Sequence, residues 1–334
     1  MMRVLAIRLG ALGDMAIVTP FIERLLAVYP DAEVTLFTAP AYVSLFGRHP
    51  RIKVQAFERK GARAMLVALR WIRTQRFDVV YDFQGSLRCR LLCAVSGAVR
   101  RIGLDKAYPY TLWANPGDPD AAQDRHVFVR LNAMLRCAGL PAAEPRVMLV
   151  TDAAERAHVQ RWLREKSLSG RPLVLMHTGS SARWVSRRWE ERHFAELARA
   201  LHERGLHVIW VGGPEERELN ARLVAHGGVN AAEAFSVLEL VELARQARFA
   251  VTNDSGPMHI IAAAGIPIYA LFGPTDWRRS HALGQGERVL THPVPCSPCY
   301  LPVCPPQREH RCLRDLTPQA VLQRLITDGM LSNQ

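Results

Sequence analysis

The feature that most constrains this chain is a repeated alternation of short apolar β-rich runs with helical patterns. The first set predicts strands and helices in turn at 4–7, 14–28, 34–37, 62–74 and 79–81. The second set predicts strands at 173–176, 208–211, 250–252 and 268–271, and helices at 190–203, 215–225, 238–246 and 258–264. Such alternation is typical of parallel sheets covered by helices. Two sets therefore predict two Rossmann-like α/β domains.

The length of 334 residues suits two domains, each large enough to bury a core. A helix expected at 152–165 fits either half, and we place the boundary after it. The predicted domains are residues 1–165 and 166–334. Thr317-Pro318 has the residue types of a helix start, and the final helix that it begins could pack back on the first domain.

The net charge of +12 is concentrated in the first half of the chain. Residues 1–150 carry 21 Lys and Arg against 12 Asp and Glu, whereas the remainder carries 22 against 19. An acidic partner is therefore expected on the N-terminal domain. The basic residues gather in the stretch 48–101, which has few aromatics and no zinc-finger or RNA-binding motif. We therefore expect a phosphorylated membrane surface or an acidic glycolipid and no nucleic acid. A general preference for arginine in this chain is the alternative.

Neither a signal peptide nor a membrane span is expected. Charges at Arg3, Arg8 and Asp14 interrupt the N-terminal apolar run. The uncharged run 255–275 contains a histidine, prolines and glycines, which favours buried α/β core over a membrane helix. We expect a cytoplasmic protein that touches a membrane without crossing it.

The glycine loop RLGALGD at 8–14 ends on an acid, which is unusual for a phosphate loop because a carboxylate would repel the anion. Asp14 could cap the following helix, or it could act in a cleft at the carboxyl ends of the strands. The glycines Gly10 and Gly13 favour the functional alternative, since they let a ligand approach the backbone.

Loops of the second domain have the composition of an anion site. In NDSGPMH at 253–259, the amides of Ser255 and Gly256 suit a diphosphate. Asp254 could accept sugar hydroxyls beside it, while His259 is either a ligand or a packed core residue. Further candidates are found in the loops after two other strands: Thr178, Ser180, Arg187 and Arg188 for the leaving diphosphate, and Glu216 for ribose.

Four cysteines cluster as Cys296-x2-Cys299-x4-Cys304-x7-Cys312 in a proline-rich segment. A structural zinc site, a disulfide pair and free thiols are the alternatives. Asp118-Pro119-Asp120 is interpreted as a turn, and no required metal or cofactor is expected.

Six motifs in order resemble the family 9 glycosyltransferases, the bacterial ADP-heptose:lipopolysaccharide heptosyltransferases. They are RLGALGD, DFQGSLR with RRIG, TGSSARWVSRRW, GGPEE, NDSGPMH with FGPTD, and CSPC. The resemblance implies a GT-B fold of two facing Rossmann-like domains with an interdomain cleft. It also implies an inverting transfer of heptose from ADP-heptose to the inner core of lipopolysaccharide, at the inner face of the inner membrane.

The resemblance also implies roles for residues. Asp14 matches the catalytic base, Arg187 takes the place of a lysine-like phosphate contact, and Phe235 is a candidate for the adenine face. Donor residues are then Thr178, Ser180, Arg187, Arg188, Glu216, Phe235, Asp254, Ser255, Gly256 and His259. Acceptor residues, for lipid A-Kdo or a heptosylated inner core, are Gly13, Arg59, Lys60, Arg63, Gln84 and Arg88. The alternatives are a family 9 transferase for another sugar or acceptor, and a non-catalytic nucleotide-sugar-binding protein.

Overall fold

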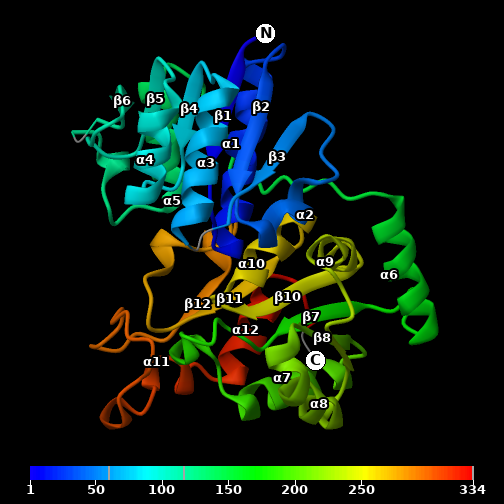
Figure 1. Ribbon diagram of the computed structural model, residues 1–334. Coiled ribbons are helices and arrows are strands. Elements are labelled where there is room, and N and C mark those ends of the chain that lie inside the picture. The colour runs from blue at the N-terminus through cyan, green and yellow to red at the C-terminus, as the bar shows by residue number, and fades with distance from the viewer. Residues whose placement is uncertain (59–60, 116, 333–334) are drawn as a thin grey trace. The chain divides into compact units, whose positions relative to one another are not determined.

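The computed structural model describes residues 1–58, 61–115 and 117–332 (Figure 1). The chain divides into two compact units, Met1–Val150 and Thr151–Gln334. Arg59 and Lys60, which the sequence proposed as acceptor residues, lie outside the described residues.

The first unit is a six-stranded parallel sheet of strand order β3-β2-β1-β4-β5-β6. Its main elements are β1 (Arg3–Ile7), α1 (Leu12–Val28), β2 (Glu33–Thr38), β3 (Ile52–Ala56), α3 (Ala62–Gln75), β4 (Val79–Asp82), α4 (Leu87–Ser96), β5 (Arg100–Gly103), β6 (Leu112–Trp113) and α5 (Val127–Cys137). The short α2 (Val43–Phe46) precedes β3. This strand order is that of a Rossmann fold.

The second unit repeats the same design with the order β12-β11-β10-β7-β8-β9. Its elements are α6 (Ala153–Glu165), β7 (Leu173–His177), α7 (Glu191–Glu203), β8 (His207–Gly212), α8 (Arg217–Leu223), β9 (Val229–Ala232), α9 (Val237–Ala244), β10 (Ala247–Asn253), α10 (Gly256–Ile261), β11 (Ile268–Phe272), β12 (Val289–Thr291), α11 (Arg311–Arg314) and α12 (Pro318–Thr327). Counted from β7, this is again the Rossmann order, so the predicted fold class is confirmed.

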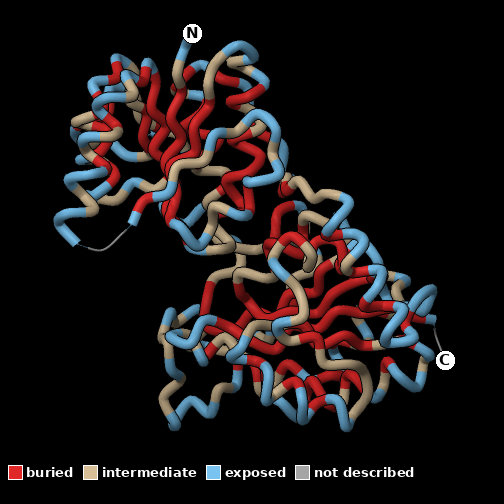
Figure 2. The backbone as a smooth tube through the Cα atoms, turned by 45° about the vertical axis from the view of Figure 1, so that its right-hand side comes forward, coloured by how far each residue is buried: buried red, intermediate tan, exposed pale blue. Residues whose placement is uncertain are grey.

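Each sheet is buried on both faces, because helices cover both (Figure 2). Strand residues alternate between the faces. In the second unit, Val174 and Met176 of β7 share one core with Phe194 of α7 and Leu325 of α12, while Leu175, between them, is buried outside that core. In the first unit, α3 and α4 cover the face to which Leu5 and Ile7 of β1 point.

The domain boundary lies before α6, not after it. The ring of Trp162 in α6 packs edge-on against Phe235, with centroids 5.0 Å apart. The Thr151 hydroxyl donates to Glu242 and accepts from Arg245 of the second unit. From the sequence, this helix fitted either half, and the boundary was predicted after it, near 165. The side-chain contacts of α6 assign it to the second unit.

Two expected helices are shorter than predicted. The segment 215–225 is a 3₁₀ turn (Pro214–Glu216), then α8, then a second 3₁₀ turn (Val224–His226). The proline before it and the glycines after it shorten the regular helix. Likewise α10 ends at Ile261 and gives way to a 3₁₀ turn (Ala262–Ala264).

Candidate active site

Several of the candidate residues follow the strands that flank the reversal of strand order in each sheet. In the first sheet the order reverses between β1 and β4, and in the second between β7 and β10. Ligands of open α/β sheets bind beyond the carboxyl ends of the strands at such points. Asp14 and Gln84 follow β1 and β4, whereas Thr178 and Asp254 follow β7 and β10.

Asp14 lies in the first turn of α1 and is held at one oxygen. Its Oδ2 accepts a hydrogen bond from the Ala11 amide at 3.1 Å and forms an ion pair of 2.6 Å with Arg8 Nη2. The N-cap of α1 is Ala11, so Asp14 is not the capping residue itself; from the third position of the helix it accepts the Ala11 amide, as in a capping box. The side chain is nevertheless 37% exposed, which leaves it accessible to a ligand.

A buried network fixes the loop that follows β4. Asp82, fully buried, accepts from the amides of Gln84 and Gly85, both at 2.9 Å, and from the Tyr110 hydroxyl at 2.6 Å. Burial raises the pKa of Asp82, and these bonds oppose the rise. Gln84 Oε1 in turn accepts from the Leu9 amide at 3.0 Å, which ties this loop to the one that carries Asp14.

The predicted acceptor residues divide between two depressions of the first unit. Gln84 and Arg88 line one, together with Leu9, Leu87 and Leu91. Arg63 lines another, with Phe57, Val67 and Trp71 among its neighbours. Gly13 lies next to Asp14 in the first turn of α1.

The side chain of Asn253 joins the donor loops of the second unit. Its Nδ2 donates to the carbonyls of Thr178 and Gly179, at 2.7 and 3.3 Å, and its Oδ1 accepts from the Trp189 amide at 3.0 Å. The Thr178 hydroxyl donates to Asn220 at 2.9 Å. Loops that lie far apart in the sequence are thus held together by buried amide groups.

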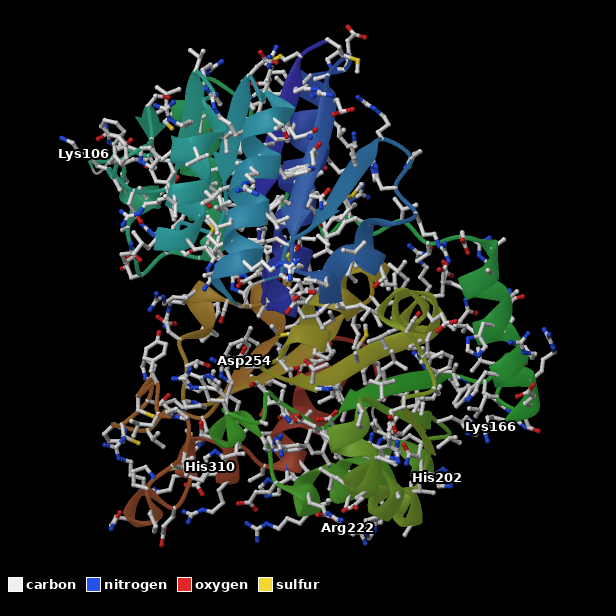
Figure 3. The ribbon with its side chains drawn as sticks, viewed as in Figure 1. Lys106, Lys166, His202, Arg222, Asp254 and His310 are labelled. Carbon is white, nitrogen blue, oxygen red and sulfur yellow. The ribbon has the colours of Figure 1, made fainter. Side chains whose placement is uncertain are left out.

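Asp254 is the partner of Arg187. Its Oδ2 lies 3.1 Å from Arg187 Nη1 and accepts from the Thr275 hydroxyl at 2.7 Å. Burial raises the pKa of Asp254, opposed by Arg187 and Thr275. The guanidinium of Arg187 also stacks over the Trp184 ring, 4.3 Å from its centroid. Asp254, which directly follows β10, is labelled in Figure 3.

Arg188 and Glu216 border the loop at 178–180. Arg188 donates to the hydroxyl and the carbonyl of Ser180, at 3.2 and 3.0 Å. Glu216, 8% exposed, accepts from the Gly213 amide at 2.8 Å, and its burial raises its pKa. A Cβ on Gly179 would clash with the Glu216 carboxylate, so a side chain at position 179 is sterically disfavoured.

Ser255 precedes α10 and contacts His177 at the end of β7. The Ser255 hydroxyl lies 3.2 Å from His177 Nδ1, and burial, with the nearby Arg188 charge, lowers the pKa of His177 to about 4. His259 is buried within α10. The structure thus brings together Thr178, Ser180, Arg187, Arg188, Glu216, Asp254 and Ser255 in neighbouring loops of one unit.

Comparison with known proteins decides the family. The model of glycosyltransferase family 9 (heptosyltransferase) matches residues 65–309. The chain belongs to glycosyltransferase family 9. It is 26% identical to lipopolysaccharide heptosyltransferase 1 of Pseudomonas aeruginosa, over 94% of this chain and 91% of the relative.

Solved structures show the same fold over the whole chain. A family 9 glycosyltransferase from Veillonella parvula superposes with a TM-score of 0.81 at 19% identity, covering 98% of this chain and 96% of the other. The E. coli ADP-heptose lipopolysaccharide heptosyltransferase II superposes with 0.72 at 24% identity, covering 98% of both. The transferase therefore has the GT-B fold expected from its motifs.

Phe235 of this family 9 transferase packs against α6. Its ring contacts Trp162 and, at 5.8 Å between centroids, His158. Both of these partners belong to α6 and not to the loops around Asn253, so the role of Phe235 at the adenine stays a prediction.

The four clustered cysteines of the transferase line one small cavity. All are free thiols, and burial together with the neighbouring Cys304, Cys299 and Cys296 raises the pKa of Cys312 to about 11. Within residues 1–58, 61–115 and 117–332, no group of three or more His, Cys, Asp or Glu has a geometry that could hold a metal ion. Asp118 and Asp120 both pair with Arg136, at 2.7 and 3.0 Å, in the expected turn.

Three residues of the family 9 loops were missed by the sequence analysis: Arg8, Asn253 and Thr275. All three lie within motifs already recognised, RLGALGD, NDSGPMH and FGPTD. The available signal for Arg8 was a charge directly after an apolar strand.

In the part of the chain that the structure describes, no helix is long and apolar enough to cross a membrane.

Proposed function

We propose that this glycosyltransferase transfers heptose from ADP-heptose to the inner core of lipopolysaccharide, with lipid A-Kdo or its heptosylated form as acceptor. The support is the likeness, over nearly the full length, to relatives named lipopolysaccharide heptosyltransferases and to one named for ADP-heptose. The observation that carries the proposal is the distribution of chemistry between the sheets: a carboxylate after β1 in one, and arginines after β7 in the other.

An inverting transfer needs one base on the acceptor side, so Asp14 is chemically sufficient. In the proposed reaction, Asp14 takes the proton of an acceptor hydroxyl as its oxygen attacks the anomeric carbon. The bond between that carbon and the diphosphate oxygen breaks on the opposite face, and ADP leaves with the bonding electrons. The configuration at the anomeric carbon is inverted.

The leaving ADP gains negative charge, which Arg187 and Arg188 are suited to stabilise. The amides near Ser255 and Gly256 would add to this. Asp254 is proposed to hold the heptose and Glu216 the ribose. Two arginines provide the charge that a divalent cation would otherwise bring, so we propose that transfer requires no metal ion or other cofactor.

The acceptor is anchored in a membrane, and α3 and α4 offer a surface suited to one. The α3–α4 surface consists of exposed Leu66, Val67, Leu87 and Leu91 with exposed Arg63, Arg70 and Arg88. Neither helix contains an acidic residue. Apolar side chains among cations fit an anionic lipid surface. We therefore propose that the enzyme is cytoplasmic and attaches to the inner face of the inner membrane through the α3–α4 surface.

The test is direct incubation with ADP-heptose and heptose-deficient lipopolysaccharide, read by mass spectrometry of the acceptor. One added heptose that persists after EDTA treatment is the expected result. Donor binding without transfer would instead support a non-catalytic binding protein, and transfer only from another nucleotide sugar would support a different family 9 activity. Activity that disappears with EDTA and returns only with Mg²⁺ or Mn²⁺ would contradict the metal-independent mechanism.

A further inference from the structure

We infer that Arg8 is a positioning residue that holds Asp14 by one carboxylate oxygen and leaves the other to take the proton. This inference rests on the proposed role of Asp14 as base. Arg8 directly follows β1, and its side chain is 8% exposed. Arginine is rarely so buried unless it is paired.

The contacts of Asp14 are unequal between its two oxygens. Oδ2 receives both the Arg8 ion pair of 2.6 Å and the Ala11 amide at 3.1 Å. Within the described residues, Oδ1 accepts no hydrogen bond. Two anchors on Oδ2, one cationic and one from the backbone, fix the plane of the carboxylate, so Oδ1 is the oxygen that faces an incoming hydroxyl.

Arg8 is itself held by the loop after β4. Its Nη1 donates to the Phe83 carbonyl, and the neighbouring Gln84 bonds the Leu9 amide. The groups around Arg8 are the carboxylates of Asp14 and Asp82 and the thiol of Cys89, with Tyr110 and Cys93 beyond Asp82. The guanidinium thereby links the first turn of α1 to the buried network of Asp82.

Fold stability alone does not account for this arginine. Its buried Nε has no hydrogen-bond partner among the described residues, and an unsatisfied buried donor destabilises a fold. Removing one member of an ion pair destabilises a fold chiefly when the charge left behind is buried, and the side chain of Asp14 is 37% exposed. The 2.6 Å ion pair with Asp14 is therefore the contact of Arg8 on which the inference rests.

The experiment compares Arg8→Met, Arg8→Lys and the control Arg101→Met by steady-state transfer kinetics and thermal unfolding. Arg101 is also an arginine of the first unit that donates to backbone carbonyls, those of Pro109 and Ala98. Among the described residues it makes no hydrogen bond or ion pair with Asp14. We expect Arg8→Met to lower kcat on the order of 100-fold, the usual effect of a misplaced catalytic group. KM for the acceptor and ADP affinity should change less than about threefold, and Arg8→Lys should recover part of the rate. Arg101→Met should leave kcat near that of the wild type.

A double-mutant cycle separates positioning from folding. In an Asp14→Asn background, Arg8→Met should cause little further loss of the residual rate, because the group that it positions is gone. A full rate in Arg8→Met, or an equal loss in both backgrounds, would overturn the inference. If Arg8→Met does not fold, the same cycle with Arg8→Lys decides. A wild-type enzyme without transfer activity would instead refute the proposed function.

Discussion

At the scale of single residues, the two sides of the reaction depend on different electrostatics. Asp14 is partly exposed and paired with Arg8, whereas Asp254 is almost fully buried against Arg187 and Thr275. A base must meet a substrate hydroxyl, so exposure suits Asp14. A buried carboxylate that accepts from Arg187 and Thr275 is suited to orienting the cation that meets a diphosphate.

Asp14→Asn should reduce transfer about 100-fold or more, because the amide cannot accept the proton. ADP-heptose affinity should remain within about twofold, since the donor residues belong to the other unit. Steady-state kinetics and calorimetry measure the two effects. If the variant retains its activity, Asp14 is not the catalytic base and serves only the contact at the start of α1.

His177 should make the stability of the enzyme depend on pH. Its pKa is lowered from 6.5 to about 4 by burial, so the unfolded chain binds more protons than the folded one between these values. The free energy of unfolding is therefore highest above pH 6.5 and falls toward pH 4, by on the order of 3 kcal/mol from this group.

The measurement is urea unfolding across this range for wild type and His177→Gln. The variant should lose less stability on acidification, whereas His202→Gln, which removes an exposed histidine of α7 (labelled in Figure 3), should behave as wild type. Equal acid sensitivity of wild type and His177→Gln would show that the ring does not titrate as its burial implies.

At the scale of elements, the cysteine segment at 296–312 supports the arginine loop. His310 Nε2 lies 2.6 Å from the Ser186 carbonyl, and the Ser186 hydroxyl donates to the Leu301 carbonyl at 2.6 Å. On its other side the segment bonds the loop after β11, where the Cys299 and Tyr300 amides donate to Pro274 at 3.0 and 2.8 Å. It thus contacts the loops of both Arg187 and Thr275.

His310→Ala should therefore weaken ADP binding about 2- to 13-fold, the effect of one lost hydrogen bond of about 0.5–1.5 kcal/mol on the placement of Arg187. Calorimetric titration with ADP measures it. Gln307→Ala, at an exposed position of the same segment, is the matched control and should leave the affinity unchanged. Equal affinities for the two variants would show that the segment does not act on the donor loops.

Elements with a strong pattern were predictable, and weakly patterned ones were not. Strands such as β1 and β7 are continuous apolar runs and were located to within two residues. In the edge strand β3, IKVQA, apolar and polar residues alternate, and β5, RRIG, is short and basic. Neither pattern was sufficient to predict a strand from the sequence.

The site was predictable where residues lie next to one another in a loop, as in NDSGPMH. It was not predictable where function depends on contacts between distant segments. The bond from Asn253 to Trp189 spans 64 residues, and the one from Leu9 to Gln84 spans 75. Such pairings are set by the strand order, which a single sequence does not display.

At the scale of the whole molecule, the α3–α4 surface should govern attachment to membranes. Each arginine near an anionic surface contributes about 1 kcal/mol, and insertion of exposed leucines adds to it. We expect cosedimentation with vesicles containing phosphatidylglycerol, and much less with pure phosphatidylcholine or at high salt.

Leu66→Ser combined with Arg70→Ser should lower vesicle binding at least about tenfold while transfer to a short, lipid-free acceptor is retained. Val224→Ser and Val303→Ser, exposed apolar positions of the second unit, serve as the control pair. Equal vesicle binding by both double variants would move the membrane contact elsewhere.

The boundary between Val150 and Thr151 assigns α6 to the same unit as the second sheet. Cutting there, rather than at the end of α6, keeps the Trp162–Phe235 pair in one piece. A chimera of two family members joined at this position should therefore fold. Its second unit would determine which nucleotide sugar it uses, and its first unit which glycolipid it accepts.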